Sequence, residues 1–235
     1  SYDLCTPDEQ QMLRHLSVFQ GGFDIADAAV VAGTTESRAI ELVDSLVAKS
    51  LVDLSRTQLG TRRRLLETIR LFALAQLVDG GEAGAARDRH LERFVGEPAL
   101  ISFAGNISLA GRARLGRELL NLRAAAAWAI ERDRPEDAAI IAAGVMDQLA
   151  SRGETALALE WLSVEPADVT AAVMGRAAEG HLRYMSFDIE GLIAAVDRAV
   201  ELADGEPIDA MPWILSSNRS LARLALGDAS SIFEG

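Results

Sequence analysis

The spacing of apolar residues predicts short amphipathic helices at the start of the chain. Thr6-Pro7-Asp8-Glu9 has the sequence of a capping box with proline in the first turn, and an apolar face follows it. Gly21-Gly22 is expected to end this first helix. Asp24 is then expected to cap a second short helix that closes at Gly33.

A third helix, a hairpin and a fourth helix follow. The third helix should begin after Thr34 or Thr35, with Ile40, Val43 and Val47 on one apolar stripe. Residues 51–55 and 61–66 are predicted strands, and the polar segment 56–60 is their loop. From about residue 68 the apolar period becomes helical again. Three helices, a hairpin and a helix are the elements of a winged helix, a helix-turn-helix variant with a β-wing.

Beyond a glycine-rich break at residues 78–86, almost all the patterns are helical. Helices are predicted at about 82–95, 112–132, from Pro135, across the segment "TALALEWLSVE", from Pro166 to about Tyr184, at "LIAAVDRAVELAD" and near the end of the chain. They form pairs of helices, each of about 12 to 18 residues, with a rough period of 35 to 45, as in tetratricopeptide-like repeats. We therefore predict a mainly α protein, with a winged-helix domain at 1–80 and a tetratricopeptide-like helical repeat domain at 81–235.

Composition narrows the classes of function. Of the 235 residues 49% are hydrophobic, which is enough for a proper core, and the formal net charge is −12. A negative chain repels nucleic-acid backbones and anionic membrane surfaces. The single cysteine excludes an intrachain disulfide and fits a reducing compartment, and we see neither a signal peptide nor a membrane-spanning stretch. We expect a cytoplasmic protein, and the absence of a starting methionine leads us to expect a piece of a longer one.

Four blocks, in order, resemble a known family. They are "SYDLCTPDEQQMLRHLSVFQGGFDIADAAVVAG", "LVDSLVAKSLVDLS", "RRLLETIRLFALAQL" and "ELLNLRAAAAWAIERD". The resemblance is to bacterial, especially actinobacterial, STAND-class signalling NTPases of the LuxR-type and AfsR-like transcriptional regulators. It covers residues 1–160 block by block, and the rest only as generic helical repeats.

The resemblance implies a division of labour. In that family a P-loop NTPase module precedes the winged helix, which packs on it and helps to hold nucleotide in the resting state. The repeats bind a protein or small-molecule effector, which would relieve autoinhibition. No P-loop sequence is present here, so ATP or ADP is expected only in the full-length protein, and this chain is not expected to be an enzyme.

The family also implies a site after the wing. Its Met-His-Asp motif, whose histidine contacts a phosphate, corresponds here to Leu65-Leu66-Glu67. Leu66 carries no hydrogen-bond donor, so direct phosphate sensing would fall to other residues. The candidate residues for an interdomain or nucleotide-proximal contact are Arg62, Arg63, Arg64, Glu67 and Arg70.

Two other interpretations of these arginines stay open. Strand alternation points Arg62 and Arg64 one way and Arg63 the other, and a solvated wing is as good an interpretation as an interdomain contact. Direct DNA binding, as a transcription factor, is the alternative function. The third helix argues against it, because Arg38 and Lys49 there face three acidic residues. Residues 1–80 carry eight Lys/Arg and eleven Asp/Glu.

The remaining chemistry-bearing residues are expected to be structural. His15 and His181 should pack at helix edges or in the core, and Cys5 should be a buried, unreactive thiol. Asp88, His90 and Glu92 are spaced by two and so spread around a helix, which indicates a charged surface rather than a metal site. The three tryptophans, Trp128, Trp161 and Trp213, should fill gaps between helices. We expect neither a catalytic constellation nor a metal site.

Overall fold

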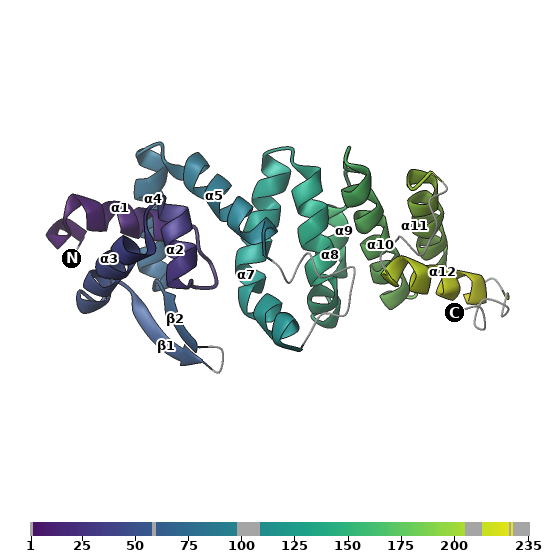
Figure 1. Cartoon of the computed structure of the whole chain (residues 1–235), viewed down its shortest axis with the longest axis horizontal. Coiled ribbons are helices and arrows are strands. Elements are labelled where there is room, and N and C mark those ends of the chain that lie inside the picture. The colour runs from purple at the N-terminus through teal and green to yellow at the C-terminus, as the bar shows by residue number, and fades with distance from the viewer. Residues whose placement is uncertain (1, 58–59, 98–108, 205–212, 226, 228–235) are drawn as a thin grey trace. The chain divides into compact units, whose positions relative to one another are not determined.

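The computed structural model describes residues 2–57, 60–97, 109–204, 213–225 and 227 (Figure 1). It is mainly helical and contains a small two-stranded sheet, so the predicted fold class with an N-terminal winged helix is confirmed. The chain divides into two compact units. The N-terminal unit comprises Ser1–Gly96 and Arg117–Trp128, and the C-terminal unit comprises Glu97–Gly116 and Ala129–Gly235.

The N-terminal unit contains the winged helix and one further helix. Its elements are a 3-10 turn at Tyr2–Leu4, α1 at Pro7–Leu16, α2 at Ile25–Ala32, α3 at Glu36–Ala48, β1 at Asp53–Thr57, β2 at Gly60–Arg64, α4 at Glu67–Asp79 and α5 at Ala83–Val95. The middle of α7, a helix that spans Leu109–Glu131, belongs to this unit as well. Figure 1 shows the hairpin of β1 and β2 extending from the α1–α3 bundle.

The predicted caps of the first three helices are confirmed. Thr6 and Glu9 form the reciprocal capping box of α1. Gly33 ends α2 in the left-handed region at a φ of +67°. Thr35 accepts a hydrogen bond from the Arg38 amide at the start of α3. The first helix nevertheless ends at Leu16, before the glycine pair that we expected to end it.

Two details of the winged helix differ from the prediction. The strands are shifted, since β1 pairs Asp53 with Arg64 and Thr57 with Gly60 in an antiparallel register. The apolar pair Leu51 and Val52, which we placed in the first strand, is instead buried ahead of it. Residues 58–59 of the expected loop lie outside the described residues.

The buried face of α3 is rotated from the predicted stripe. Its buried residues are Ala39, Leu42, Val43 and Leu46, whereas Ile40 is exposed. Spacings of three and four residues join these buried positions, as expected for one face of a helix. The spacing of apolar residues therefore predicted the helix correctly, but the predicted buried face was wrong at Ile40.

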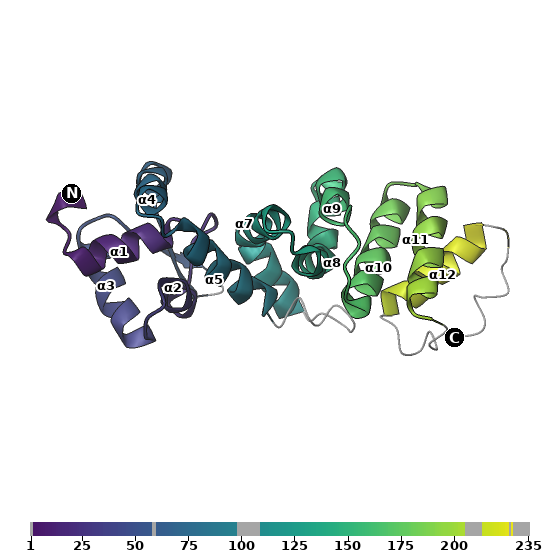
Figure 2. The ribbon, with the colours of Figure 1, turned by 90° about the horizontal axis from the view of Figure 1, so that it is seen from above.

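The C-terminal unit is built from helices throughout its described part. Its elements are the two ends of α7, α8 at Pro135–Ser151, α9 at Thr155–Trp161, α10 at Val169–Met185, α11 at Ile189–Leu202 and α12 at Trp213–Ala225. Figure 2 shows α10 and α11 side by side, with α12 across them. The core is rich in alanine, and Gly175 lies against Ala139 and Leu162. Small side chains therefore let α8 and α10 approach closely.

The same three-residue turn recurs between helices. In the turns that follow α7, α8 and α10, the middle residue is left-handed: Asp133 at a φ of +55°, Gly153 at +74° and Phe187 at +60°. In each turn the last amide donates to a carbonyl in the preceding helix, as Asp188 does to Arg183 at 2.9 Å. The turn at Gly81, before α5, has the same form. A repeated turn of one geometry is typical of helical-repeat proteins.

The second helix pair differs from the predicted lengths. α9 has only seven residues, shorter than the 12 to 18 we expected. The next helix begins at Val169 rather than at Pro166, because Asp168 is its cap and accepts from the Ala171 amide at 2.8 Å. The residue before a proline avoids helical geometry, so Glu165 would not continue the preceding helix, although α9 already ends at Trp161.

The predicted boundary after residue 80 stays a prediction. α5 packs on α2 and clusters with the winged helix, so compactness alone places the limit of the N-terminal unit later, at Gly96. Among the described residues, no helix combines the length and apolar character needed to cross a bilayer.

Candidate functional site

The three wing arginines have three different environments, which sequence alternation could not distinguish. Arg62 is buried, and its guanidinium makes a bidentate pair with Glu118 of α7 at 2.7 and 2.6 Å. It also donates to the backbone carbonyls of Gly21 and Gly22, the latter at 2.8 Å. These contacts engage the whole guanidinium edge, so Arg62 is an internal anchor for the wing.

Asn121 of α7 completes this anchor. Its side-chain oxygen accepts from the amides of Gln20 and Gly21, and its nitrogen donates to Gly22 and to Glu118. Gly22 has a φ of +80°, and a Cβ there would lie 2.6 Å from the Arg63 carbonyl oxygen. Only glycine fits this conformation, because the loop before α2 and the wing strand approach so closely.

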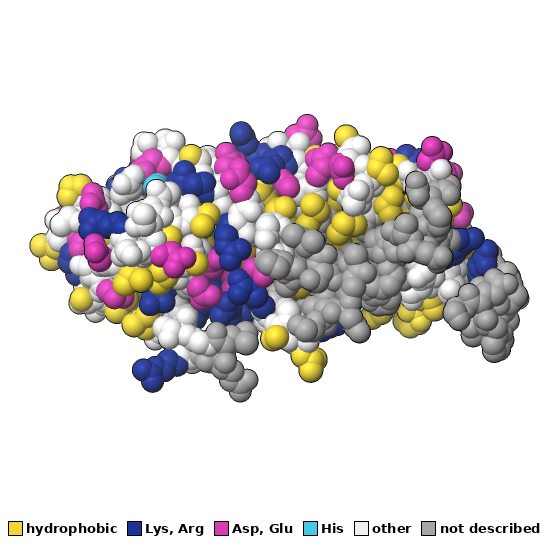
Figure 3. All heavy atoms as spheres, in the orientation of Figure 1, with side chains coloured by type: hydrophobic (Ala, Val, Ile, Leu, Met, Phe, Trp, Pro, Cys, Tyr) yellow, Lys and Arg dark blue, Asp and Glu magenta, His cyan; other side chains and the backbone are white. Residues whose placement is uncertain are grey.

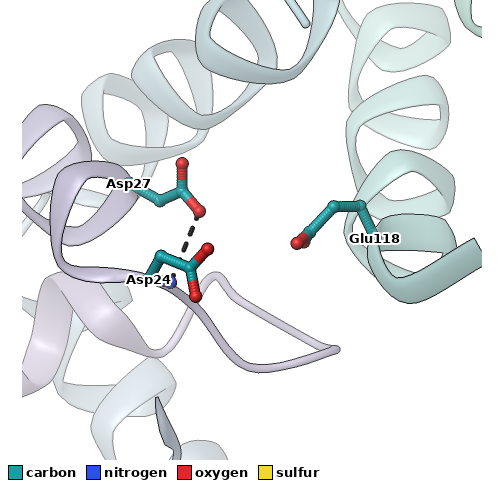
Figure 4. Close-up of side chains that lie close together, drawn as sticks. All are labelled: Asp24, Asp27 and Glu118. Carbon is teal, nitrogen blue, oxygen red and sulfur yellow. Dashed lines mark hydrogen bonds between the residues drawn. The ribbon is translucent and has the colours of Figure 1, made fainter. Parts of the chain in front are cut away.

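Three carboxylates gather beside the anchor. Asp24 from the α2 cap, Asp27 from α2 and Glu118 from α7 have oxygens within 4.8 Å of one another (Figure 4). Each also has an arginine partner: Arg117 lies 2.8 Å from Asp24, Arg93 lies 2.8 Å from Asp27, and Arg62 holds Glu118. Burial raises the pKa of Asp27 despite Arg93. Three acids matched by three arginines form a charge-balanced network. They are not an uncompensated cluster of carboxylates that would favour a bound metal cation.

Sequence reasoning missed Glu118 and Asn121. The signal that could have found them is a polar pair three residues apart within the apolar stripe of Leu115, Leu119 and Leu122. Polar residues on a buried face need buried partners. Arg62 of the wing is the partner of Glu118, and the loop at Gly21 and Gly22 is the partner of Asn121.

Arg63 and Arg64 lie nearer the surface. The backbone of Arg63 pairs with Phe23 in both directions, at 2.8 and 3.2 Å, which adds a short bridge to the wing sheet. The side chain of Arg64 is 61% exposed and lies 3.5 Å from Asp53 across the hairpin. An exposed pair of this kind contributes little to stability, so Arg64 is available to a partner.

Glu67 and Arg70 form a local pair at the start of α4. Arg70 donates to both carboxylate oxygens of Glu67 at 2.8 and 2.7 Å, and to the carbonyl of Ser17. The hydrogen bonds from Arg70 lower the pKa of Glu67. Leu66, the helix cap, provides no side-chain hydrogen bond to the helix, and it is exposed. The first turn of α4 therefore presents uncapped amides beside a paired acid and arginine.

A cleft of about 370 Å³ brings these residues together. It is lined by Phe19, Gln20, Gly21, Gly22, Arg64, Leu65, Leu66, Glu67, Arg70 and Leu120. Of the five predicted site residues, Arg64, Glu67 and Arg70 therefore line one cleft. Arg62 and Arg63 do not line it.

The outer face of α4 is apolar. Leu71 and Val78 are 52% and 54% exposed, and exposed Ala75 lies between them on the same stripe. The helix buries Ala73 and Leu77 on its other side. A helix that is apolar on both sides is normally covered on both sides. This α4 face, defined as Leu71, Ala75 and Val78, thus has no partner among the described residues and lies next to the cleft.

The third helix presents an acidic surface where a DNA reader would present cations. Its exposed acids are Glu36, Glu41 and Asp44. Arg38 is held by Asp8 at 2.5 Å and by Glu41 at 2.9 Å, and Lys49 is paired with Glu9. On the face in Figure 3, acidic side chains lie among the basic ones over the N-terminal unit. α3 therefore lacks free cations for the grooves of DNA.

The three histidines are held by polar or buried surroundings. His15 is buried and lies 3.0 Å from Glu82, as expected of a structural histidine, and burial lowers its pKa. His181 lies 3.1 Å from Asp147. The prediction was wrong for His90, which is buried among Phe19 and Phe94 rather than on a charged surface. Burial lowers the pKa of His90 to about 3, against a hydrogen bond with Asn121.

Cys5 and two of the tryptophans fit their structural interpretation. Cys5 is buried, and burial raises the pKa of its thiol, which suppresses the reactive thiolate. Trp161 is buried in the C-terminal unit. Trp128 is half-buried, donates to Asp88 at 2.8 Å and lies under Arg87. The side chain of Trp213 lies outside the described residues.

Comparison with known proteins agrees with this geometry. Residues 6–78 match the family described as "Winged helix-turn-helix domain". Over 167 residues the chain is 35% identical to proteins named "Putative HTH-type transcriptional regulator" in Mycobacterium tuberculosis and Mycobacterium bovis. It is also 33% identical over 114 residues to an uncharacterized Mycobacterium tuberculosis protein, covering 45% of this chain and 28% of that protein. No solved structure matches the chain.

The match to the regulators covers only part of them. It spans 69% of this chain but 19% of each regulator's length. The winged helix and the similarity to transcriptional regulators support a regulatory role for the chain.

Proposed function

We propose that this chain is the regulatory and docking region of a STAND-type signalling ATPase and transcriptional regulator. Its winged helix docks on the NTPase module of the full-length protein, and its helical repeats bind an effector. The observation that carries the proposal is the α4 face, whose exposed Leu71 and Val78 have no partner among the described residues. Nucleotide chemistry belongs to the module and not to this chain.

The chemistry of the α4 face favours a protein partner. An apolar stripe gains free energy when it leaves water, at about 25 cal/mol per Å². Contact with a folded domain would bury this stripe, whereas DNA would offer it phosphates. The wing is rigid on the neighbouring side, because Arg62 and Asn121 fix the loop at Gly21 and Gly22. A pre-organised surface loses little entropy on docking.

The cleft beside this face would then lie near the nucleotide. Arg64, Glu67 and Arg70 line it with the uncapped start of α4, and backbone amides at a helix start favour anions. Arg62 is not included, since its donors already serve Glu118 and the glycine carbonyls. The Glu67–Arg70 pair would have to open before Arg70 could meet a phosphate.

The C-terminal unit supplies the sensing half of the proposal. The helix pair of α10 and α11 runs from Val169 to Leu202, close to the length of about 34 residues of a tetratricopeptide unit. An effector bound here would shift the docked state only if it favoured one of two states. The repeated left-handed turns support this architecture.

Titration calorimetry can test the docking. The P-loop NTPase module of the longer regulator would be produced separately, loaded with ADP, and titrated with this chain. We expect micromolar or tighter binding, and we expect Leu71→Asp with Val78→Asp to weaken it at least tenfold because a charge would be buried without a partner.

Two controls sharpen the result. Val30→Asp, at another exposed apolar position on α2, should leave the affinity unchanged. Circular dichroism should show that all the variants are folded. Wild-type affinity in the Leu71/Val78 variant would remove the α4 face from the proposal, and no binding by the wild-type chain would remove docking itself.

A further inference from the structure

A phenylalanine occupies a turn position that disfavours it. Phe187, between α10 and α11, has a φ of +60°, whereas the equivalent turns have Asp133, Gly153 and Gly81. Glycine adopts this conformation freely and aspartate tolerates it, but a bulky side chain clashes with its own backbone there. Phe187 is therefore locally unfavourable for the fold, and its presence calls for another reason.

The phenylalanine is also almost completely in water. Its side chain is 90% exposed, and Tyr184 and Met185 beside it are exposed as well. These three residues lie at the turn of the helical hairpin of α10 and α11, not on the β-wing, and are called the hairpin tip. Neither folding nor solubility benefits from an aromatic ring in this place, whereas protein interfaces are enriched in aromatic residues and methionine.

The backbone that carries the tip is held rigidly. Asp188 caps α11 by accepting from the Gly191 amide at 2.9 Å, and Arg183 donates to the same carboxylate at 2.9 Å. Arg183 also pairs with Glu179. A Cβ at Gly191 would lie 2.5 Å from Asp188, so the turn has no slack. A ring presented on a fixed turn loses little freedom when it binds.

Charge indicates what the tip meets. On the outer face of α11, exposed Glu190, Asp197 and Glu201 follow one helical stripe from the tip, with Ala194 among them. Of these acids, Glu201 pairs with Arg198 at 3.0 Å. In its full sequence, the C-terminal unit carries 20 Asp/Glu against 10 Lys/Arg, while the N-terminal unit carries 15 against 13. A second copy of this chain would bring the same negative charge and be repelled.

We propose that the hairpin tip and the acidic stripe of α11 form a docking surface for a basic, amphipathic segment of a partner protein. Phe187, with Tyr184 and Met185, inserts among the apolar side chains of that segment. The stripe from Glu190 to Glu201 meets its lysines and arginines and steers its approach. This inference rests on the proposed function only in taking the repeats as the effector-binding half.

Fluorescence anisotropy with a defined probe tests the proposal. The probe is a labelled, 18-residue helical peptide of leucine and lysine, with a leucine and glutamate peptide of the same pattern as the charge control. We expect the full chain to bind the lysine peptide and not the glutamate peptide. Phe187→Asn should weaken binding at least tenfold while the Tm stays unchanged or rises, because asparagine tolerates the left-handed turn.

Matched variants separate the tip from general charge attraction. Glu190→Gln with Asp197→Asn should weaken binding several-fold and flatten its salt dependence. Asp44→Asn with Glu36→Gln removes the same charge from α3 in the N-terminal unit and should change neither quantity. Leu4→Ser removes an equally exposed apolar side chain elsewhere and should leave the affinity unchanged.

Three outcomes would overturn the inference: a folded Phe187→Asn chain that binds like wild type, equal losses in both charge pairs, or equal affinity for both peptides. The Leu71/Val78 variant should bind the lysine peptide normally. A wild-type chain that binds the lysine peptide but not the module would therefore count against the proposed function alone. The reverse pattern would count against the hairpin tip alone.

Discussion

The two units use their charges differently. In the N-terminal unit acids and bases are nearly equal in number, and a buried group of them, Arg62 and Glu118, fixes the wing to the loop before α2 together with Asn121. In the C-terminal unit acids outnumber bases two to one, and ion pairs such as the one between Arg198 and Glu165 lie at the surface. Buried charge makes the first unit rigid and sensitive to substitution. Surface charge leaves the second unit tolerant of substitution at its charged residues. The excess of negative charge there can attract a basic partner.

Substitution of the buried anchor residue Arg62 should produce the largest difference in stability loss between the two units. Arg62→Met leaves Glu118 buried without its bidentate partner, and should cost the N-terminal unit about 3–5 kcal/mol. Arg198→Met, which removes an exposed guanidinium from the C-terminal unit, should cost at most about 1 kcal/mol. Hydrogen exchange followed by mass spectrometry in increasing urea reports each unit separately.

The double variant Arg62→Met/Glu118→Leu is the internal control. Removing both charges together should restore most of the lost stability, because no buried charge is left over. If the single and double variants lose the same stability, the loss comes from packing and not from charge.

Substitution of Gly22 in the N-terminal unit and of Gly153 in the C-terminal unit should give the next largest difference in stability loss. Gly22→Ala should cost about 2–4 kcal/mol, because the new Cβ meets a carbonyl oxygen at 2.6 Å in addition to the left-handed strain. Gly153→Ala, at a φ of +74° with nothing nearby, should cost only about 1 kcal/mol. Urea titrations of the two variants compare these costs, and equal costs would show that the wing and its loop do not approach as closely as described.

Mild acid should affect the units in a fixed order. The pKa of His90 in the folded chain is lowered to about 3 by burial. As pH falls, the unfolded chain therefore takes up this proton at a higher pH than the folded chain does. Stability of the N-terminal unit is therefore complete above pH 6.5 and falls as pH drops towards 3, by about 1 kcal/mol between pH 6.5 and 5.5.

Among the described residues of the C-terminal unit, the groups that titrate in acid with a shifted pKa are carboxylates, and they respond at lower pH. Hydrogen bonds from Arg198, and then from Arg176, lower the pKa of Glu165 to about 2, so its contribution is lost only as pH falls from about 4.5 towards 2. Hydrogen exchange at pH 7, 5.5 and 4.5 should show the N-terminal unit weakening first. His90→Gln should flatten this response, and an unchanged response would assign it to other groups.

DNA binding should be the smallest of the expected effects. In a mobility-shift assay at 50 mM salt, we expect no complex with mixed-sequence duplex below micromolar concentrations, because the exposed α3 surface is acidic and Arg38 is already paired. Asp8→Ala should release Arg38 and still give no complex. A complex that Arg38→Ala abolishes would restore DNA reading by α3.

Local signals carried most of the prediction, and contacts distant in the chain did not. Capping at Thr6, Thr35 and Gly33 is readable from neighbouring residues, and the helices appeared near their predicted places. The fate of Arg62 depended on Glu118, which is 56 positions away, so no local pattern distinguished it from Arg64. The buried place of His90 likewise followed from tertiary packing against Phe19 and Phe94, and the early end of α9 at Trp161 has no local signal in the sequence.

The central claim is that the winged helix acts through α4 and not through α3. Hydrogen exchange of this chain with and without the ADP-loaded NTPase module measures this directly. We predict slower exchange over Glu67–Asp79 and no change over Glu36–Ala48. Protection confined to α3, or unchanged exchange in α4 at saturating module, would contradict the account.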